Sequence, residues 1–466
     1  MYVRIRSIRR ITNDANHNAF TGVCYFKGAL YVAYREGAAH ADPTGKIIVL
    51  RSNDEGKHFE TVAVFRKQSD ARDAHLYSDG QKLYAVGFEA DSEKKYWKTF
   101  TAWTEDGRNW SEWTETQGTE GFILWKPQFH KGKYYCAGYG EFERGKSSTV
   151  AWFESDDAVR WERKYDIHKG KDIPTECYLD FFKNDVAVMI MRCDDKTKKP
   201  YLCKSEPPYR KWDMVRLDIP LLGPCLWVVN DEIWISGRWF LHPDITHVGV
   251  FKIKDNKSEL RLVLPSGPGF DISYMGATRD PENPSRFWFS YYSGHTAPQD
   301  PDIDQFSHPD IYLVEALFYS ARNFICDWLI SDVKDISLDQ AKYCDSRDKN
   351  IVWRKISAYK DAESSASVIG FVDAGKYTKG KKGVIYFTTD VDLGPIENAK
   401  MYLGYDGPVI VWLNGQQIFS GPGTNPAIVD KTKIPINARH GRNTITIALD
   451  TNGGKAEGIF CKIVSE

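Results

Sequence analysis

The sequence of 466 residues lacks a disulfide framework, a strong net charge and any long apolar run. Its nine cysteines are odd in number and irregularly spaced, which indicates buried, reduced core residues and not a disulfide-linked scaffold. A formal net charge of −1 argues against a nucleic-acid partner bound through bulk charge. No apolar stretch approaches the roughly 18 residues of a membrane-spanning helix, so no membrane span is expected.

The sequence also lacks the signatures of a metal site and of an export signal. No cluster of His and Cys has metal-ligand spacing, so neither a metal nor a cofactor is expected. The basic segment Met1–Arg10 is not followed by an apolar segment, so it is not a signal peptide, and its alternation of Val3 and Ile5 with arginines predicts a strand. The compartment stays open: secreted or periplasmic if a signal peptide was removed, and otherwise cytoplasmic.

What the sequence does contain is a repeat in its first half. Phe59, Trp110, Trp161 and Trp212 follow one another at intervals of 51 residues, and each closes a phrase of the form Ser/Thr-x-Asp-(x)-Gly-x-x-Trp. A strand-rich period of 40–50 residues is typical of a β-propeller with one four-stranded blade per repeat. In such a phrase, called an Asp-box, the Asp accepts backbone hydrogen bonds of the turn and the Gly allows a positive φ. The phrase therefore indicates the fold and not the chemistry.

Length and repeat together predict an all-β chain of two domains. A chain of 466 residues is too long for one core. Extending the repeat gives six blades, which assigns residues 1–321 to a six-bladed β-propeller and residues 322–466 to a second, strand-rich domain. In the second domain, Asn414-Gly415 stands between two apolar stretches and predicts a β-hairpin.

The repeat also aligns polar residues of successive blades. First-strand positions in equivalent places are Asn18, Arg72 with Asp73, Lys126, Glu176, Cys225 and Tyr274. Second-strand positions are Arg35, Phe88, Tyr139, Arg192, Arg238 and Tyr292. Because equivalent strand ends ring one mouth of a propeller channel, the charged residues among them and Tyr274 are expected to converge. Arginine suits bidentate capture of a carboxylate, and a cluster of cations indicates an acidic ligand.

With these residues the chain resembles the sialidase superfamily of glycoside hydrolases, over about residues 15–320. The resemblance implies a Glu paired with an Arg one hairpin later, as Glu176 and Arg192 are, and a further Arg on the fifth blade, as Arg238 is. It also implies a Tyr nucleophile on the first strand of the last blade, which is Tyr274, activated by Glu176. An arginine followed by an acid loop in the first blade corresponds to Arg35 and the loop that contains His40 and Asp42, either of which is a candidate acid/base.

The chain departs from this family at the first strand. Sialidases open with Arg-Ile-Pro, which supplies the first of three carboxylate-binding arginines, whereas this chain has Asn16–Gly22 without an arginine. The phrase Ala71–His75 adds Asp73 as a further catalytic candidate, and Arg72, His75 and Lys126 as substrate-binding candidates. The site therefore resembles a sialidase site adapted to a different acidic sugar.

Three functions are compatible with this sequence. The first is a retaining exo-glycosidase that acts on a terminal acidic sugar of a glycan. The second is a polysaccharide lyase, in which Arg or Lys neutralises a uronate and His75, His40 or Tyr274 removes the α-proton. The third is a sugar-binding propeller without catalysis, which needs no pairing of Glu with Tyr.

The second domain resembles the galactose-binding-like jelly-roll modules attached to many glycosidases. The resemblance rests on the phrase from Asp406-Gly407 through Val-Trp-Leu to Asn414-Gly415 and implies a C-terminal β-sandwich. Such modules bind sugar or support the catalytic domain. We favour support, because Trp412 in the middle of a strand is expected to be buried.

Overall fold

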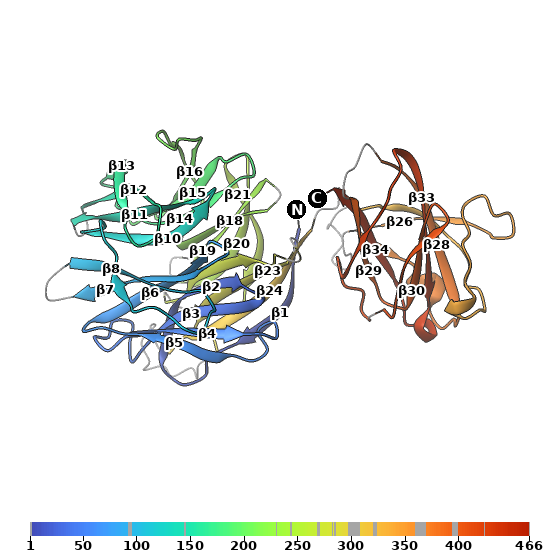
Figure 1. The fold of residues 1–466 in the computed structure, drawn as a ribbon, viewed down its shortest axis with the longest axis horizontal. Helices are drawn as coiled ribbons and strands as arrows, with labels where there is room; N and C mark the ends of the chain where they lie inside the picture. The colour runs from blue at the N-terminus through green and yellow to red at the C-terminus, as the bar shows by residue number, and fades with distance from the viewer. Residues whose placement is uncertain are drawn as a thin grey trace. The chain divides into compact units, whose positions relative to one another are not determined.

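The computed structural model describes residues 2–91, 96–143, 146–229, 231–242, 245–267, 271–281, 283, 286–296, 308–319, 324–358, 370–393, 399–423 and 425–465. The chain divides into two compact units, Tyr2–Phe318 and Tyr319–Glu466 (Figure 1). The boundary expected at residue 321 falls outside the described residues. No helix in the described ranges is long and apolar enough to cross a membrane. All nine cysteines are described as thiols, and eight of them are buried.

In its described residues the first unit contains strands and connecting loops but no helix. Its strands are β1 (Tyr2–Arg10), β2 (His17–Phe26), β3 (Ala29–Gly37), β4 (Lys46–Ser52), β5 (Glu60–Phe65), β6 (Asp70–Ser78), β7 (Leu83–Asp91), β8 (Tyr96–Thr104), β9 (Thr114–Glu115), β10 (Phe122–His130), β11 (Lys133–Glu143) and β12 (Ser147–Ser155). They continue with β13 (Glu162–Gly170), β14 (Pro174–Phe181), β15 (Ala187–Cys193), β16 (Tyr201–Ser205), β17 (Asp213–Arg216), β18 (Leu221–Val229), β19 (Glu232–His242), β20 (Ile245–Lys254), β21 (Lys257–Leu264), β22 (Ser273–Arg279), β23 (Arg286–Ser293) and β24 (Asp310–Tyr319).

These strands form propeller-like sheets of four strands each. Five sheets take four consecutive strands, from β2–β5 to β18–β21, and the remaining sheet has the order β1-β24-β23-β22. The strand predicted near the N-terminus is therefore confirmed as β1, and it joins the sheet made from the end of the unit. Arg6 pairs there with Glu315 at 3.1 Å, and the Ile11 N–H donates to the Ile311 carbonyl at 2.7 Å.

A β-bulge recurs in one strand of each of these four-stranded sheets, namely β2, β6, β10, β14, β18 and β22. The pairing of this strand with the next one along the chain shifts between Ala19 and Gly22, Arg72 and His75, Trp125 and Gln128, Pro174 and Cys177, Leu222 and Cys225, and Ser273 and Gly276. In five sheets a bulge residue has a positive φ: 53° at Phe20, 54° at Asp73, 50° at Lys126, 53° at Gly223 and 41° at Tyr274. Such bulges bend a strand and redirect a side chain, and the positive φ is costly for residues other than glycine.

The repeated phrases form matching turns. In the second sheet, the Asp106 carboxylate accepts the N–H groups of Arg108 and Asn109, both at 2.8 Å. In the third, Asp157 accepts the N–H groups of Val159 and Arg160, also at 2.8 Å. Gly107 has a φ of 76°, and a Cβ atom built on it would lie 1.8 Å from the hydroxyl oxygen of Tyr31 in the preceding sheet. This turn thus packs directly on its neighbour.

The described residues of the second unit form ten strands and three single-turn helices. These elements are β25 (Asp327–Ile330), η2 (Leu338–Gln340), β26 (Arg354–Ser357), β27 (Phe371–Asp373), α1 (Gly375–Thr378), β28 (Val384–Leu393), β29 (Ala399–Tyr405), β30 (Val409–Leu413), β31 (Gln416–Gly421), β32 (Thr432–Pro435), β33 (Gly441–Asp450), η3 (Asn452–Gly454) and β34 (Gly458–Ser465). They form a six-stranded sheet, β26-β25-β28-β33-β30-β31, and a four-stranded sheet, β27-β34-β29-β32. Ile447 and Val411 of the first sheet share one apolar core with Met401 and Ile459 of the second.

The hairpin predicted at Asn414-Gly415 is confirmed. β30 pairs with β31, and the two turn residues have φ values of 53° and 86°, as a type I′ turn requires. Trp412, which precedes the turn, is only 5% exposed and packs in a cluster with Tyr386.

We expect Gly107→Ala to destabilise the chain by roughly 2–4 kcal/mol, because strain at a positive φ adds to overlap with Tyr31. Gly80→Ala is the matched control: Gly80 has a φ of 89°, but its Cβ would meet no atom within 4 Å. That variant should lose only about 1–2 kcal/mol. Urea unfolding of both variants measures the difference, and equal losses would contradict packing between the sheets at this turn.

Candidate functional site

Three side chains from two sheets meet in one hydrogen-bonded group. Tyr274 in β22 donates its hydroxyl proton to Glu176 Oε1 in β14 at 2.7 Å. Arg192 Nη1 in β15 donates to that same Glu176 oxygen and to the Tyr274 hydroxyl, in both cases at 2.7 Å. The other Glu176 oxygen is buried without a hydrogen-bond partner. The arrangement places a carboxylate where it can accept the phenol proton.

Burial dominates the electrostatics of Tyr274. It raises the pKa of the phenol far above its usual value, and the charge of Glu176 raises it further, whereas Arg192 and Arg238 oppose the rise. A phenol in this position reacts as a nucleophile only if a base removes its proton as the new bond forms. Glu176 is positioned for that transfer.

The arginines predicted for the site differ in their surroundings. Arg238 donates to the Ile272 carbonyl at 3.2 and 3.1 Å. Arg72 lies over the Phe20 ring, with its guanidinium carbon 4.7 Å from the ring centroid. Arg35 is fully buried, and it donates to Asp70 at 2.7 Å and to the Ala39 carbonyl at 2.9 Å. Its Nη2 atom is buried without a hydrogen-bond partner, and the predicted role of Arg35 in substrate binding stays a prediction.

Asp42 lies in the loop between β3 and β4 and is hydrogen-bonded within it. Its carboxylate accepts the Ala38 N–H at 2.6 Å and the N–H and hydroxyl of Thr44 at 2.8 and 2.9 Å. These bonds hold the loop between β3 and β4 in shape. Asp42 is thus engaged as a turn residue, because both of its oxygens accept hydrogen bonds within its own loop.

Asp73 occupies the bulge of the second sheet and is 7% exposed. Burial raises the pKa of its carboxyl to about 7, while Arg72 opposes the rise and Glu176 adds to it. One carboxyl oxygen has no hydrogen-bond partner. Asp73 is therefore largely protonated below neutral pH and can donate a hydrogen bond there.

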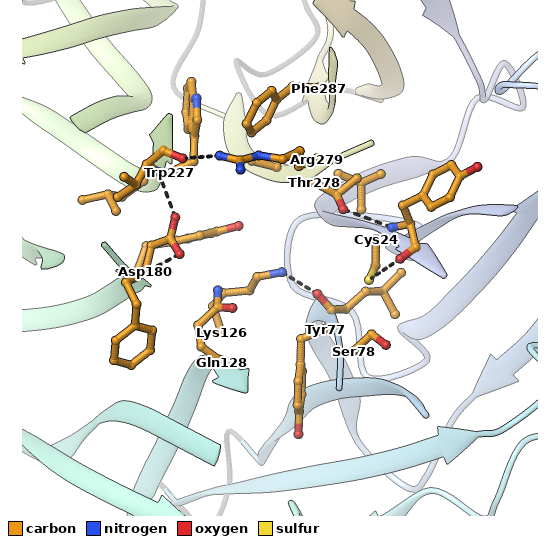
Figure 2. A pocket seen from close by; sticks show the side chains of 18 residues that line it. Cys24, Tyr77, Ser78, Lys126, Gln128, Asp180, Trp227, Thr278, Arg279 and Phe287 are labelled. Carbon is orange, nitrogen blue, oxygen red and sulfur yellow. Dashed lines mark hydrogen bonds between the residues drawn. The ribbon is translucent and has the colours of Figure 1, made fainter. Parts of the chain in front are cut away.

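Lys126 and His75 line two different cavities of the first unit, and His75 shares its cavity with Tyr274 and Asp73. Lys126 lines a cavity of about 390 Å³, and there its ammonium donates to the Leu76 carbonyl (Figure 2). Burial, with a contribution from Lys126, lowers the pKa of His75 to about 3. The cavity that His75 shares with Tyr274 measures only about 10 Å³, room for a single water molecule and not for a sugar.

Asn18 does not occupy the position that the repeat assigned to it. The bulge of β2 places Phe20 in the ring instead, and the Asn18 amide donates to Asp14 at 2.7 Å. Phe20 is the common neighbour of the site: its ring centroid lies 5.3 Å from that of Tyr274 and 5.4 Å from that of His40. In the fifth sheet the bulge residue is likewise Gly223 and not Cys225.

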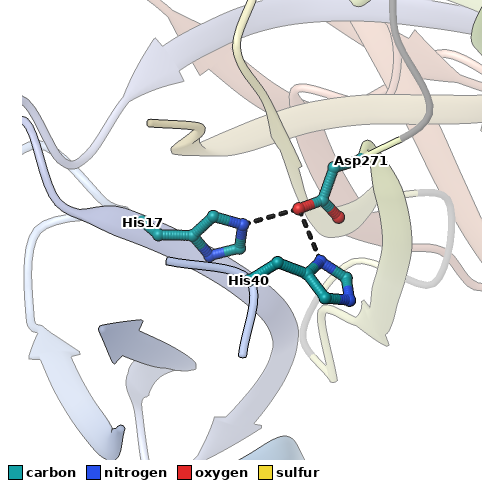
Figure 3. Close-up of side chains that lie close together, drawn as sticks. All are labelled: His17, His40 and Asp271. Atoms are coloured by element: carbon teal, nitrogen blue, oxygen red, sulfur yellow. Dashed lines mark hydrogen bonds and ion pairs between the residues drawn. The ribbon is translucent and has the colours of Figure 1, made fainter. Parts of the chain in front are cut away.

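Beside Phe20 lies a cluster that joins the predicted site residue His40 to two residues that the sequence pattern did not single out, His17 and Asp271. His17 Nε2 and His40 Nδ1 both contact Asp271 Oδ2, at 2.5 and 2.8 Å (Figure 3). Tyr292 donates to the other oxygen of Asp271 at 2.7 Å. Burial opposes ionisation of Asp271, but the hydrogen bonds from His17 and His40 hold the pKa of its carboxyl well below the usual range.

The same three residues form a possible metal site, which the sequence did not indicate. The ligand atoms of His17, His40 and Asp271 lie within 4.8 Å of one another, so the three residues could hold a metal ion. Sequence spacing could not show this, because Asp271 is 231 residues from His40. Only folding brings the three residues together.

No family model matches the chain, and no curated protein matches it. Solved structures do resemble it. A protein of unknown function from Dyadobacter fermentans DSM 18053 has a TM-score of 0.57 at 14% identity and covers 68% of this chain and 99% of its own. The sialidase of Trypanosoma rangeli, in complex with the inhibitor DANA, has a TM-score of 0.50 at 9% identity and covers 96% of this chain and 91% of its own. At these identities the likeness shows a shared fold.

We expect Asp73→Asn to remove a pH-dependent loss of stability. The folded pKa of about 7 exceeds the ordinary 3.8, so the unfolded chain releases this proton first. The contribution of Asp73 to stability is therefore complete below pH 3.8 and declines as the pH rises towards 7. Denaturant unfolding between these pH values should show a smaller decline for Asp73→Asn than for the wild type. Asp156→Asn serves as the control, because that side chain is 89% exposed. If the stability of Asp73→Asn declines with pH as much as that of the wild type, Asp73 is not a buried acid with a raised pKa.

Proposed function

We propose that the first unit is a six-bladed propeller that works as a retaining exo-glycosidase on a terminal acidic sugar. The observation that carries the proposal is the group of Glu176, Tyr274 and Arg192, joined by three hydrogen bonds of 2.7 Å. The shared fold with a sialidase agrees with it. A binding protein without catalysis has no need of a buried carboxylate that is hydrogen-bonded to a half-buried phenol.

In this proposal Tyr274 is the nucleophile and Glu176 its base. A sugar with a carboxylate on its anomeric carbon repels a charged nucleophile, whereas a neutral phenol approaches without that cost. As the Tyr274 oxygen bonds to the anomeric carbon, its proton passes to Glu176. Arg192 contacts both groups and stabilises the negative charge that moves between them.

The anionic part of the substrate is held by arginines of three sheets. Arg192 and Arg238 come from the fourth and fifth sheets, and Arg72 from the second. The place beside them is filled by Phe20, which has no hydrogen-bond donor. A carboxylate at this site therefore binds in a different orientation from one held by an arginine on the first sheet.

We propose that the second unit is a β-sandwich that supports the enzyme without binding sugar. Trp412, the aromatic residue of its characteristic phrase, is buried against Tyr386 and Cys344 and does not offer a face for stacking. Asp406 of the same phrase accepts the Glu457 N–H at 2.6 Å. Both residues are engaged within the unit.

We expect Tyr274→Phe and Glu176→Gln each to lower turnover at least about a hundred-fold, because one removes the nucleophile and the other its base. Tyr77→Phe, at a buried tyrosine whose hydroxyl has no partner, is the matched control and should keep its activity. The assay uses a panel of acidic glycosides and follows both reducing sugar and an unsaturated, ultraviolet-absorbing product. Release of the unsaturated product alone would identify a lyase. Release of neither product would favour a binding protein without catalysis.

We expect an aryl sialoside to be a poor substrate. The contact that an arginine would make at the position of Phe20 is worth roughly 1.5–3 kcal/mol, which corresponds to about ten- to a hundred-fold in kcat/KM. Another acidic aryl glycoside in the panel should therefore be cleaved faster by about that factor. If the sialoside is instead the best substrate of the panel, and its cleavage is abolished in Tyr274→Phe, Phe20 does not determine specificity.

A further inference from the structure

We propose that His40, held by Asp271, is the acid/base of this site and that Arg72 covers its reactive nitrogen until an anionic substrate binds. The inference rests on the proposed glycosidase function. It also gives the buried cluster of His17, Asp271 and Tyr292 a role, which is to orient His40.

Hydrogen-bond partners determine which nitrogen of His40 carries the proton. Asp271 is a carboxylate and only accepts, so His40 Nδ1 at 2.8 Å must be the donor. Arg72 Nη2 lies 3.3 Å from His40 Nε2, and a guanidinium only donates. Nε2 therefore presents its lone pair to Arg72. His40 can therefore act as a base through Nε2, the nitrogen that Arg72 contacts in this structure.

Asp271 is built to hold an imidazole in place. Its side chain is 1% exposed, and its two oxygens receive His17, His40 and Tyr292. A buried carboxylate on one ring nitrogen fixes the tautomer of a histidine and stabilises the imidazolium that forms when the other nitrogen is protonated. His40 itself is 40% exposed, so it forms the solvent-facing end of the cluster.

His40 and the proposed nucleophile Tyr274 both pack against Phe20. Phe20 packs edge-on against both His40 and Tyr274, and Arg72 lies over its ring. A sugar whose anomeric carbon meets Tyr274 would therefore bring its leaving oxygen to the side of the site where His40 stands. Its anionic group would compete with His40 Nε2 for Arg72, because a charged oxygen is a stronger acceptor for a guanidinium than a neutral imidazole.

The reaction balances with these groups. Once Arg72 turns to the substrate, Nε2 takes a proton from solvent. In the first step the Tyr274 oxygen bonds to the anomeric carbon, its proton passes to Glu176, and the glycosidic bond breaks as His40 gives its Nε2 proton to the leaving oxygen. In the second, a water bonds to the anomeric carbon and gives a proton to Nε2, while the bond to Tyr274 breaks and the phenolate recovers its proton from Glu176.

A metal centre is the competing interpretation of the same three residues. A divalent cation between His17, His40 and Asp271 would lie near the positive guanidinium of Arg72, which opposes it. With a metal on Nδ1, the proton of His40 would sit on Nε2 and point at the Arg72 donor. The contact with Arg72 thus favours a proton-transfer site.

The experiment compares His40→Gln and Asp271→Asn with wild type on glycosides that differ only in leaving group. The probes are the 4-nitrophenyl and methyl glycosides of N-acetylneuraminic acid and of glucuronic acid. 4-Nitrophenolate leaves without being protonated, whereas the methyl glycoside needs an acid to protonate its leaving oxygen. In His40→Gln, kcat/KM should therefore fall less than about ten-fold on the aryl substrate and about 10²- to 10⁴-fold on the methyl substrate. Added azide, which needs no base, should speed aryl turnover in His40→Gln and yield a glycosyl azide. Asp271→Asn should show the same pattern with smaller losses.

The matched control is His58→Gln. The His58 side chain is 89% exposed and pairs with Asp54 at 2.5 Å. The variant therefore tests a histidine–carboxylate pair outside the site. Equal losses of His40→Gln on both leaving groups, or no loss, would overturn the inference and leave the glycosidase standing. Loss of wild-type activity with a chelator and recovery with Zn²⁺ would overturn it in favour of a metal centre. A wild type that cleaves no glycoside of the panel would overturn both proposals.

Discussion

The β-bulge in one strand of each four-stranded sheet of the first unit is the constraint on which the site depends. In a regular strand, successive side chains alternate between the two faces of the sheet, and none points along the axis. The bulge turns one residue per sheet out of that alternation and places Phe20, Asp73 and Tyr274 around a common centre. Their positive φ values carry a conformational cost that the surrounding sheets must offset. Strain of this kind is expected where geometry serves function.

The charges near the mouth are arranged so that few of them lack a partner. Arg35 and Asp70 form a fully enclosed pair, and Arg192 is bonded to Glu176 and, through Nε, to Asp194 at 2.8 Å. Removing one member of such a buried pair is costly, because it leaves the other charge uncompensated. The cations that remain for a ligand are therefore fewer than the composition of the strands suggests.

The cluster at Asp271 shows how a propeller can assemble a site from distant segments. His17 comes from the start of the first sheet, His40 from the loop after β3, and Asp271 from the segment before β22. The sheet closed by β1 and β24 brings the two ends of the unit together and so brings these residues into contact. The contact of His40 with Arg72 then couples this cluster to the second sheet.

The sequence by itself determined the all-β content, the repeat of sheets and the hairpin at Asn414-Gly415, because turn chemistry and strand periodicity are local. It also predicted from the repeat that Glu176, Arg192 and Tyr274 converge, and these three side chains are hydrogen-bonded to one another. It placed Asn18 in the ring, where the structure has Phe20 two residues later, because nothing local in the sequence marks the position of the bulge. Burial decided that Arg35 is enclosed, and closure of the sheets decided that Asp271 meets His40. Both depend on contacts between segments far apart in the chain, which only the tertiary structure brings together.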